Sequence, residues 1–390
     1  MTNHPLADSK LRTESLNLLR FPLAVVVVMM HIFGPNVVFI DGQPYSSECF
    51  PVFLELKHFM EGFLRGQSVP IYFFISGYVF FWGISLTRET YLRKLKNRSK
   101  TLLIPYLIWN TLALLQILVL SSSLFQSLFT SGNDPQLDTA FPNLLRCFWG
   151  GATYLPADAA AAASDAVTAT SAVSPLYPIN PPLWFLRNLM IIVLTAPALY
   201  YILKHTRHYV LVLLGLLWFA KTYIPMDIPL NLLTGYFFFS WGAYMSIHNK
   251  DMLVEFGKYF RPSVFLYVFL SLSYVASVHW SPVASATLKQ LNIFVGLIFA
   301  YNLASWLLRR QICRPNAFLA SASFFIYVSH TLVWSYILRI LFKVMPLDSD
   351  FGVCFVYSAT LVLTIGLLLL AFWLMRRYTP GLLRVVAGKK

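Results

Sequence analysis

Residues 15–35 read SLNLLRFPLAVVVVMMHIFGP, a nearly continuous apolar run that carries two ionisable side chains, Arg20 and His31. An α-helix rises about 1.5 Å per residue, so a helix over this run would be about 30 Å long and would match the hydrocarbon thickness of a membrane. The run is longer than the apolar core of a cleavable signal peptide, and it contains an arginine. It therefore predicts a first membrane-spanning helix that remains in the mature protein.

Apolar runs of similar length recur to the end of the chain. The 390 residues are 57% hydrophobic and only 12% charged, whereas an average soluble domain has roughly 45–50% and roughly 25%. This composition predicts an all-α, polytopic membrane protein and excludes an ordinary soluble domain. We expect about ten membrane-spanning helices, at residues 16–39, 67–86, 102–124, 183–203, 209–224, 229–247, 262–280, 287–308, 317–342 and 351–375.

The charges between these runs predict the orientation of the protein. The net charge is +14, and most Lys and Arg residues fall in alternate loops, on the same side as both termini. The positive-inside rule places these segments in the cytoplasm. Basic residues between apolar runs are a topology signal and a contact for membrane lipid, so the positive charge does not indicate nucleic-acid binding.

The spans and their orientation divide the chain into three parts. Residues 1–15 and 377–390 are expected to be a cytoplasmic N-terminal segment and a basic cytoplasmic tail, and residues 16–376 are expected to form the membrane domain. The longest outer loop covers residues 125–182 and contains the stretch ADAAAAASDAVTATSAVS at residues 157–174. This stretch has low complexity and no apolar periodicity, which is typical of an insertion rather than a domain.

Cysteines and histidines give few signals for cross-links or metals. Cys49 and Cys147 are the cysteines on the predicted outer side, where oxidation is favoured, so they are candidates for a disulfide. The eight histidines form neither an HExxH pattern nor a cluster in the sequence, and no Walker loop or dinucleotide fingerprint is present. The sequence thus predicts neither a metal site nor a tightly bound cofactor.

Arg20 and His31 are the strongest candidates for a functional site. They are eleven residues apart, so on an ideal helix they lie within about 20° of one face and about 16.5 Å apart along the axis. An ionisable group at membrane depth marks function by default, and a histidine suits a general base near neutral pH. Two structural roles remain open: Arg20 as a snorkelling anchor at the interface, and His31 as a hydrogen-bonded packing residue.

The chain resembles the acyltransferase 3 family of integral-membrane acyltransferases over residues 15 to about 376. Besides the Arg20 and His31 pair, five family-like segments follow in the expected order: VPIYFFISGYVF at 69–80, RSKTLLIPYLIWN at 98–110, PPLWFLRNLM at 181–190, FFFSWGAYMS at 237–246 and SFFIYVSH at 323–330. This resemblance implies transfer of an acyl group, usually acetyl, from cytoplasmic acetyl-CoA to a hydroxyl of a cell-surface or secreted glycan. It further implies a multi-pass protein of the bacterial inner membrane, with Arg20 and His31 at the paired positions needed for activity.

The donor, acyl-CoA, is anionic, so its nucleotide end needs a basic site. Arg98 matches the first basic residue of a family arginine pair, while Thr101 stands at the second position with Lys100 beside it. We therefore expect Arg98, Lys100 and Lys94 to bind the donor, with the Ser76 hydroxyl as a further contact. The basic run at residues 93–100 is also explained by topology alone.

The acceptor, a glycan, is expected to meet residues of two spans, and Trp184 and Arg187 begin the first of these at the outer interface. Trp184 and Arg187 offer a stacking face and hydrogen-bond donors, although an interfacial tryptophan is also common in membrane proteins. Tyr327 and His330 are three residues apart and share one helix face. Acyl-CoA and a glycan are thus the expected partners, and the oligomeric state is open.

Two other classes of membrane protein are less consistent with the sequence. A transporter or flippase for a glycan or small molecule would line a path with charges from several helices, whereas the intramembrane charge is concentrated in the first span. A glycan polymerase would carry an outer loop rich in arginine and aromatic residues. Residues 125–182 contain a single arginine, Arg146.

Overall fold

The computed structural model describes residues 5–34, 37–40, 43–64, 66–83, 85–120, 136–155, 177–224, 231–345 and 349–388. The low-complexity stretch at 157–174 and the larger part of the predicted outer loop 125–182 lie outside this range.

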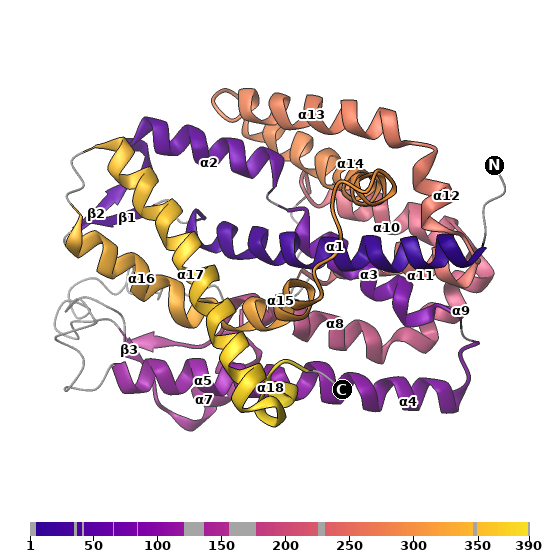
Figure 1. The fold of residues 1–390 in the computed structure, drawn as a ribbon, viewed down its shortest axis with the longest axis horizontal. Coiled ribbons are helices and arrows are strands. Elements are labelled where there is room, and N and C mark those ends of the chain that lie inside the picture. Colours follow the sequence, from indigo (N-terminus) through magenta and orange to yellow (C-terminus); the bar gives the residue numbers. More distant parts are fainter. Residues whose placement is uncertain are drawn as a thin grey trace.

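The described chain is almost entirely helical, which confirms the predicted fold class (Figure 1). The helices are α1 Pro5–Ile32, α2 Pro51–Phe63, α3 Ser68–Phe81, α4 Arg88–Arg98, α5 Ile104–Leu120, α7 Phe141–Trp149, α8 Trp184–Leu194, α9 Ala196–Thr206, α10 Tyr209–Ala220, α11 Leu232–Ile247, α12 Met252–Gly257, α13 Phe260–Ser277, α14 Pro282–Arg309, α15 Ala317–Ser329, α16 Thr331–Val344, α17 Asp350–Tyr378 and α18 Pro380–Val386. Two short antiparallel hairpins complete it, β1 Val37–Ile40 with β2 Gln43–Ser46, and β3 Gln136–Leu137 with β4 Tyr154–Leu155.

Helices occur at all ten predicted spans, but fewer are long enough to cross a membrane. In the described part of the chain, five helices have the length and apolarity of a span, and two bent helix pairs raise this number to seven. The remaining predicted spans correspond to α3, α10 and α11, which have 14, 12 and 16 residues. A full crossing needs about 20 residues, so the described part of the chain has five to seven helices or helix pairs of sufficient length, fewer than the ten expected, and the prediction of a polytopic membrane protein is confirmed.

The ends of the predicted membrane domain extend into helices. α1 begins at Pro5 and includes most of the predicted N-terminal segment. At the other end, α18 occupies part of the predicted tail and packs on α5, where the indole Nε1 of Trp109 donates a hydrogen bond of 2.9 Å to the carbonyl of Val386.

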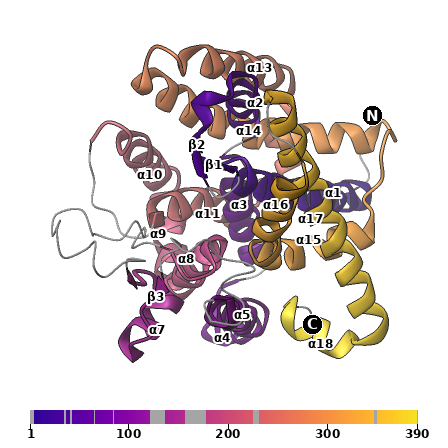
Figure 2. The same ribbon diagram turned by 90° about the vertical axis from the view of Figure 1, so that its left-hand side faces the viewer.

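Helix α1 occupies the centre of the bundle. Figure 2 looks along the long axis and places α1 and α3 between α13 and α14 on one side and α4 and α5 on the other. α3 packs against α11 with the backbones in contact, because a Cβ at Gly77 would collide with the Phe239 carbonyl and one at Gly242 would collide with the Phe74 carbonyl. Small residues permit this close approach of helices in lipid. Gly77 and Gly242 therefore have a packing role at this helix contact.

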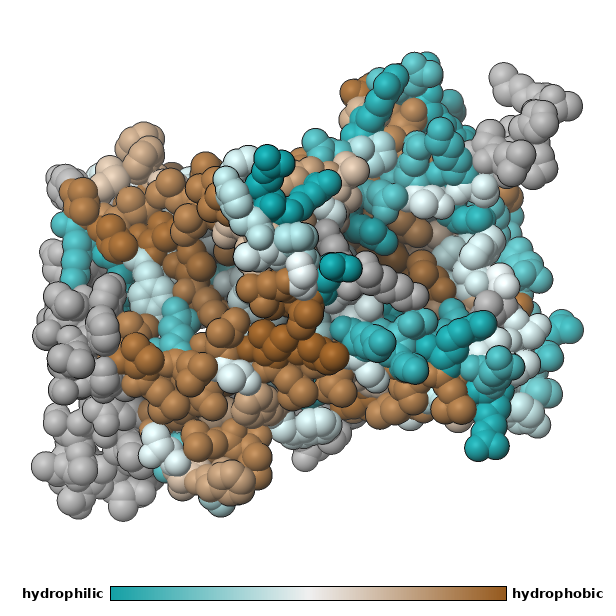
Figure 3. All heavy atoms as spheres, turned by 60° about the horizontal axis from the view of Figure 1, so that its bottom comes forward, coloured by the Kyte–Doolittle hydropathy of each residue, from teal (hydrophilic) through white to brown (hydrophobic). Residues whose placement is uncertain are grey.

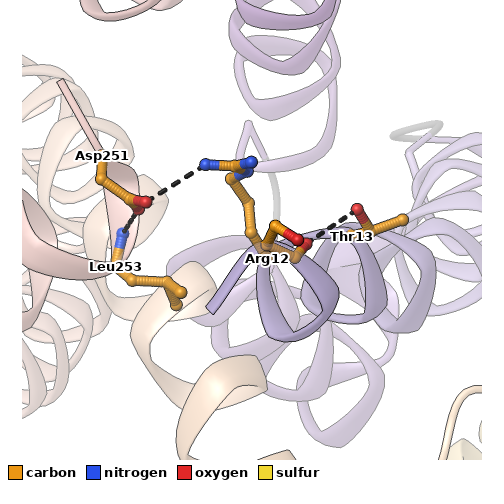
Figure 4. Close-up of polar contacts among 5 residues, drawn as sticks. Arg12, Thr13, Asp251 and Leu253 are labelled. Carbon is orange, nitrogen blue, oxygen red and sulfur yellow. Dashed lines mark hydrogen bonds and ion pairs between the residues drawn. The ribbon is translucent and has the colours of Figure 1, made fainter. Parts of the chain in front are cut away.

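An ion pair fixes the start of α1. Arg12 donates to the Asp251 carboxylate at 3.1 Å, and Asp251 in turn accepts from the backbone N–H of Leu253 at 2.8 Å and so caps α12 (Figure 4). The Arg12 guanidinium also lies 3.8 Å from the ring centroid of Trp82, directly after α3. These contacts tie together the beginning of α1, the end of α3 and the beginning of α12.

The surface is divided along the long axis. In Figure 3, apolar residues cover a broad area over one part of the molecule, and hydrophilic residues gather at the end where α1 and α4 begin. The exposed apolar side chains include leucines and valines of α5 and α17, such as Leu115 and Val362. Such a surface is suited to contact with lipid.

The two candidate cysteines are not joined by a disulfide. Cys147 on α7 is fully buried in a small apolar cluster with Ala113 and Ile179, and Cys49 is exposed beside the first hairpin. Both thiols are free, so the predicted disulfide is wrong. Burial among apolar side chains raises the pKa of the Cys147 thiol.

Candidate functional site

Two histidines that are distant in the sequence meet where the end of α1 approaches the junction of α15 and α16. His31 lies in the last turn of α1, and His330 lies between α15 and α16, where the two helices bend by 76°. The ring centroids are 5.0 Å apart, and the rings meet edge to face at 65°. The structure thus brings together one residue predicted to be catalytic and one predicted to contact the acceptor.

Both imidazole rings are oriented by backbone carbonyls. The Nδ1 atom of His31 lies 2.8 Å from the carbonyl oxygen of Val27, and the Nδ1 atom of His330 lies 2.8 Å from that of Tyr327. A carbonyl oxygen only accepts hydrogen bonds, so we assign the ring proton of each neutral histidine to Nδ1. Each Nε2 atom then carries a lone pair that can accept a proton.

The burial of the two rings differs. His330 is fully buried, and its Nε2 atom has no hydrogen-bond partner among the residues that the structure describes. His31 is half-buried. A buried polar atom without a partner is uncommon in proteins and is found at functional sites.

A network of buried amides holds the bend that carries His330. Asn180 precedes the 3₁₀ turn Pro181–Leu183 that leads into α8. It donates through Nδ2 to the Val328 carbonyl at 3.0 Å and accepts from the Thr331 hydroxyl at 2.7 Å. Its backbone N–H donates to the Oδ1 atom of Asn110 on α5 at 3.2 Å. Asn180 therefore connects α5 to the last turn of α15 and the first turn of α16.

Arg20 lies on α1 together with His31, as predicted. Eleven residues, or three helical turns, separate the two. The side chain of Arg20 is exposed and forms no ion pair with another described residue. The Tyr72 hydroxyl donates to the Arg20 carbonyl at 2.9 Å.

A row of aromatic rings continues from Tyr72 toward the histidines. The ring of Phe185 lies 6.0 Å from that of Tyr72 and 6.1 Å from that of Tyr327. Tyr327 donates its hydroxyl proton to the Pro182 carbonyl, and its own carbonyl accepts from His330. This row connects the level of Arg20 with the histidine pair.

The predicted donor-binding residues lie on α3, α4 and the π-helical segment Ser99–Leu103. Lys94 donates to the carbonyl of Phe80 and lies 5.0 Å from its ring centroid, so this lysine connects α4 to α3. Lys100 is exposed, while Arg98 and Ser76 are half-buried. Lys100 and Arg98 are thus the better placed of these residues to meet an anion.

The predicted acceptor-binding residues of α8 differ from each other. Trp184 is half-buried and lies 6.4 Å from the ring of Phe73. Arg187 is buried, donates to the carbonyl of Trp149 and, at 3.3 Å, to the Oδ1 atom of Asn188. Arg187 therefore anchors α7 to α8.

Sequence reasoning did not identify Tyr72, Asn110 or Asn180. A signal for Asn110 was present, because a lone amide within an apolar run must find a partner at membrane depth. Asn180 lies outside the predicted spans, and its role became visible only once the fold placed it beside the bend at His330.

Comparisons with known proteins identify the family of this chain. The family model of the acyltransferase domain matches residues 13–377, a range that includes Arg20, His31 and His330. Among curated proteins, the succinoglycan biosynthesis protein ExoH of Rhizobium meliloti (strain 1021) is 26% identical over an alignment 388 residues long, which covers 96% of this chain and 92% of the relative. No solved structure matches the chain. Because the family match covers nearly the whole membrane bundle, this chain belongs to the acyltransferase domain family.

Proposed function

We propose that this protein transfers an acyl group, preferentially acetyl, from cytoplasmic acyl-CoA to a hydroxyl of a cell-surface or secreted polysaccharide. Membership of the acyltransferase domain family supports the reaction class. The name of the relative ExoH places that protein in the biosynthesis of succinoglycan, and this supports a polysaccharide acceptor. We place the reaction at the inner membrane of a bacterium, where cytoplasmic acyl-CoA can reach the membrane domain.

The pairing of His31 with His330 is the observation that carries this proposal. An alcohol that attacks a thioester must lose its proton, and the Nε2 atom of His31 is assigned a lone pair by the hydrogen bond of Nδ1 to Val27. His31 takes the hydroxyl proton while the oxygen forms a bond to the acyl carbon. The bond from that carbon to sulfur then breaks, and the departing CoA sulfur receives the proton from His31.

His330 has a supporting part in the proposed reaction. Its ring lies 5.0 Å from that of His31, and its Nδ1 atom is held by Tyr327. The buried Nε2 atom of His330 can orient the attacking hydroxyl or accept a hydrogen bond from the protonated His31. Because it adds no net charge when neutral, it does so without opposing the protonation of His31.

The donor enters from the end of the bundle that carries the basic residues. Arg98 and Lys100 would bind the phosphates of CoA, and Arg20 would contact the pantetheine arm or a phosphate. The arm would then follow α1 and the row of Tyr72, Phe185 and Tyr327 over the about 16.5 Å that separate Arg20 from His31. The acceptor would approach His31 from the opposite side, past Trp184.

The test is acyl transfer by the purified protein in detergent. Labelled acetyl-CoA is incubated with a polysaccharide isolated from cells that lack the protein, and incorporation of label into the polysaccharide is measured. Incorporation that requires the wild-type chain supports the proposal. Hydrolysis of acetyl-CoA without incorporation, or no reaction with any polysaccharide of the producing cell, would contradict it.

A further inference from the structure

A second group of ionisable side chains lies away from the histidine pair. Glu55 and His58 belong to α2, and His279 follows the last turn of α13. One potential ligand atom from each residue can be chosen such that all three atoms lie within 4.8 Å of one another. The sequence offered no hint of this cluster, because more than 200 residues separate His279 from the other two.

The distances within the group are close to those of a metal site. The Oε1 atom of Glu55 lies 3.1 Å from the Nε2 atom of His279 and 3.8 Å from the Nδ1 atom of His58. Zinc binds such atoms at about 2.0–2.2 Å, and tetrahedral geometry then places neighbouring ligand atoms about 3.3 Å apart. Small rotations of the side chains would thus bring all three atoms to one ion.

One of the three side chains is largely buried, and the other two are exposed to solvent. His58 is only 14% exposed, and its Nδ1 atom has no hydrogen-bond partner in the part of the chain that the structure describes. Glu55 and His279 are 52% and 51% exposed. One ligand therefore comes from the interior, and the other two leave an entry from solvent.

The scaffold beneath the group is fixed by several hydrogen bonds. Tyr274 of α13 donates to the Glu61 carboxylate at 2.9 Å, and Asn292 of α14 donates to the Gly62 carbonyl at 2.6 Å. Tyr267 donates to the carbonyl of Phe63. Because the C-terminal end of α2 is held by α13 and α14, Glu55 and His58 are presented by a fixed helix, and His279 lies in the turn that directly follows α13.

We propose that Glu55, His58 and His279 bind one divalent transition-metal ion and join α2 to the end of α13. Two imidazoles and one carboxylate are the ligands that zinc accepts, and they are poorly suited to calcium or magnesium, which prefer oxygen ligands alone. Three protein ligands leave a fourth position for water. By the predicted topology the site lies on the outer side of the membrane, remote from the donor.

The probe is Zn²⁺, with Co²⁺ as a spectroscopic substitute, and the protein is the full-length chain in detergent without a histidine tag. After treatment with a chelator, Zn²⁺ binding is measured by calorimetry and the bound metal is counted by elemental analysis. We expect one ion per chain, visible absorption from tetrahedral Co²⁺, and a higher unfolding temperature with Zn²⁺ than without it.

Substitutions at exposed ligands test the site without disturbing the core. His279→Gln and Glu55→Gln each remove a metal ligand. Loss of a residue that only hydrogen-bonds to a ligand already lowers metal affinity about 10–100-fold, so each variant should lower Zn²⁺ affinity by at least this factor. The matched controls are His205→Gln on α9 and Glu255→Gln on α12, and these should bind as the wild type does. His58→Gln should abolish the increase in unfolding temperature.

Two results would overturn the proposal. One is a wild-type protein that binds no Zn²⁺ at micromolar concentrations. The other is a His279→Gln, Glu55→Gln double variant that binds Zn²⁺ as tightly as the controls do, because binding would then occur elsewhere. Neither result depends on acyl transfer, so this proposal and the proposed function can fail separately.

Discussion

Replacing Asn180 by alanine should separate the positioning of His330 from the chemistry of the histidine pair. The side chain of Asn180 is 1% exposed and forms two hydrogen bonds across the bend, to the Val328 carbonyl and the Thr331 hydroxyl. Asn180→Ala removes both, while the bond from its backbone N–H to Asn110 can remain. The bend between α15 and α16 would then lose its main polar support.

The structure sets the size of the effect. Hydrogen bonds between helices in membrane proteins contribute about 0.6 kcal/mol each on average, so two of them give a lower bound near 1 kcal/mol. A buried group left without its partner costs about 1–3 kcal/mol. We therefore expect Asn180→Ala to lower the free energy of unfolding by about 1–3 kcal/mol. Thr331→Val removes one of the two bonds and should have a smaller effect.

Function should suffer more than stability. A shift of about 1 Å at a reacting group can cost about 100-fold in rate, so Asn180→Ala should lose about 10–100-fold in acyl transfer while acetyl-CoA affinity stays unchanged. The assays are SDS unfolding in mixed micelles, transfer of labelled acetyl, and calorimetry with acetyl-CoA.

Asn316→Ala is the matched control. Asn316 caps the opposite end of α15 through hydrogen bonds to the N–H groups of Phe318 and Leu319, and loss of such a cap costs about 0.5–2 kcal/mol. This variant should be destabilised to a similar degree and still transfer acetyl. If both variants lose transfer equally, or if Asn180→Ala transfers at the wild-type rate, the positioning role is refuted.

Three further predictions concern other parts of the protein. In His330→Asn, the amide can still donate to the Tyr327 carbonyl but lacks a basic nitrogen, so the protein should be folded by circular dichroism and its acetyl transfer should be reduced about 100-fold. Unchanged transfer would leave His330 with a structural role. The Arg98→Gln, Lys100→Gln double variant should bind acetyl-CoA more weakly and with less dependence on salt, whereas the Lys204→Gln, Arg207→Gln control on the same predicted side should bind as the wild type does. If both double variants bind acetyl-CoA with the same affinity, the basic segment has a role in topology alone. Mass spectrometry after alkylation of the folded protein should find Cys49 labelled and the buried, raised-pKa Cys147 protected, and an equal extent of labelling would contradict the described packing of α7.

The sequence was most informative where a single helix carries the signal. Arg20 and His31 lie on one helix as their spacing predicted, and Gly77 has the packing role typical of a small residue in a membrane helix. Apolar composition identified the class of protein because the hydrocarbon core imposes it on every span. Of the three predicted spans that are too short for a full crossing, α3 and α11 are apolar largely through burial within the protein, whereas α10 is short and mostly exposed.

Contacts between distant segments could not be predicted. Nothing in the spacing of His31 and His330 indicates that their rings meet, and nothing in the sequence around Arg187 indicates that it donates to the Trp149 carbonyl. Helix α2 lies outside the predicted spans, because its 13 residues are too few to cross a membrane. The predicted disulfide failed for the same reason, since two cysteines on one side of a membrane need not be neighbours.

The acetyl-transfer rate of purified His31→Ala, measured together with its acetyl-CoA affinity, tests the central claim most directly. If His31 is the general base, transfer falls by about 10²–10⁴-fold while the affinity for acetyl-CoA stays unchanged. Arg20→Ala, in contrast, should weaken donor binding as well as transfer, and Arg20→Lys should restore it only in part because lysine lacks the planar guanidinium. A folded His31→Ala protein that transfers acetyl at the wild-type rate, or that loses acetyl-CoA binding as Arg20→Ala does, would contradict the assignment.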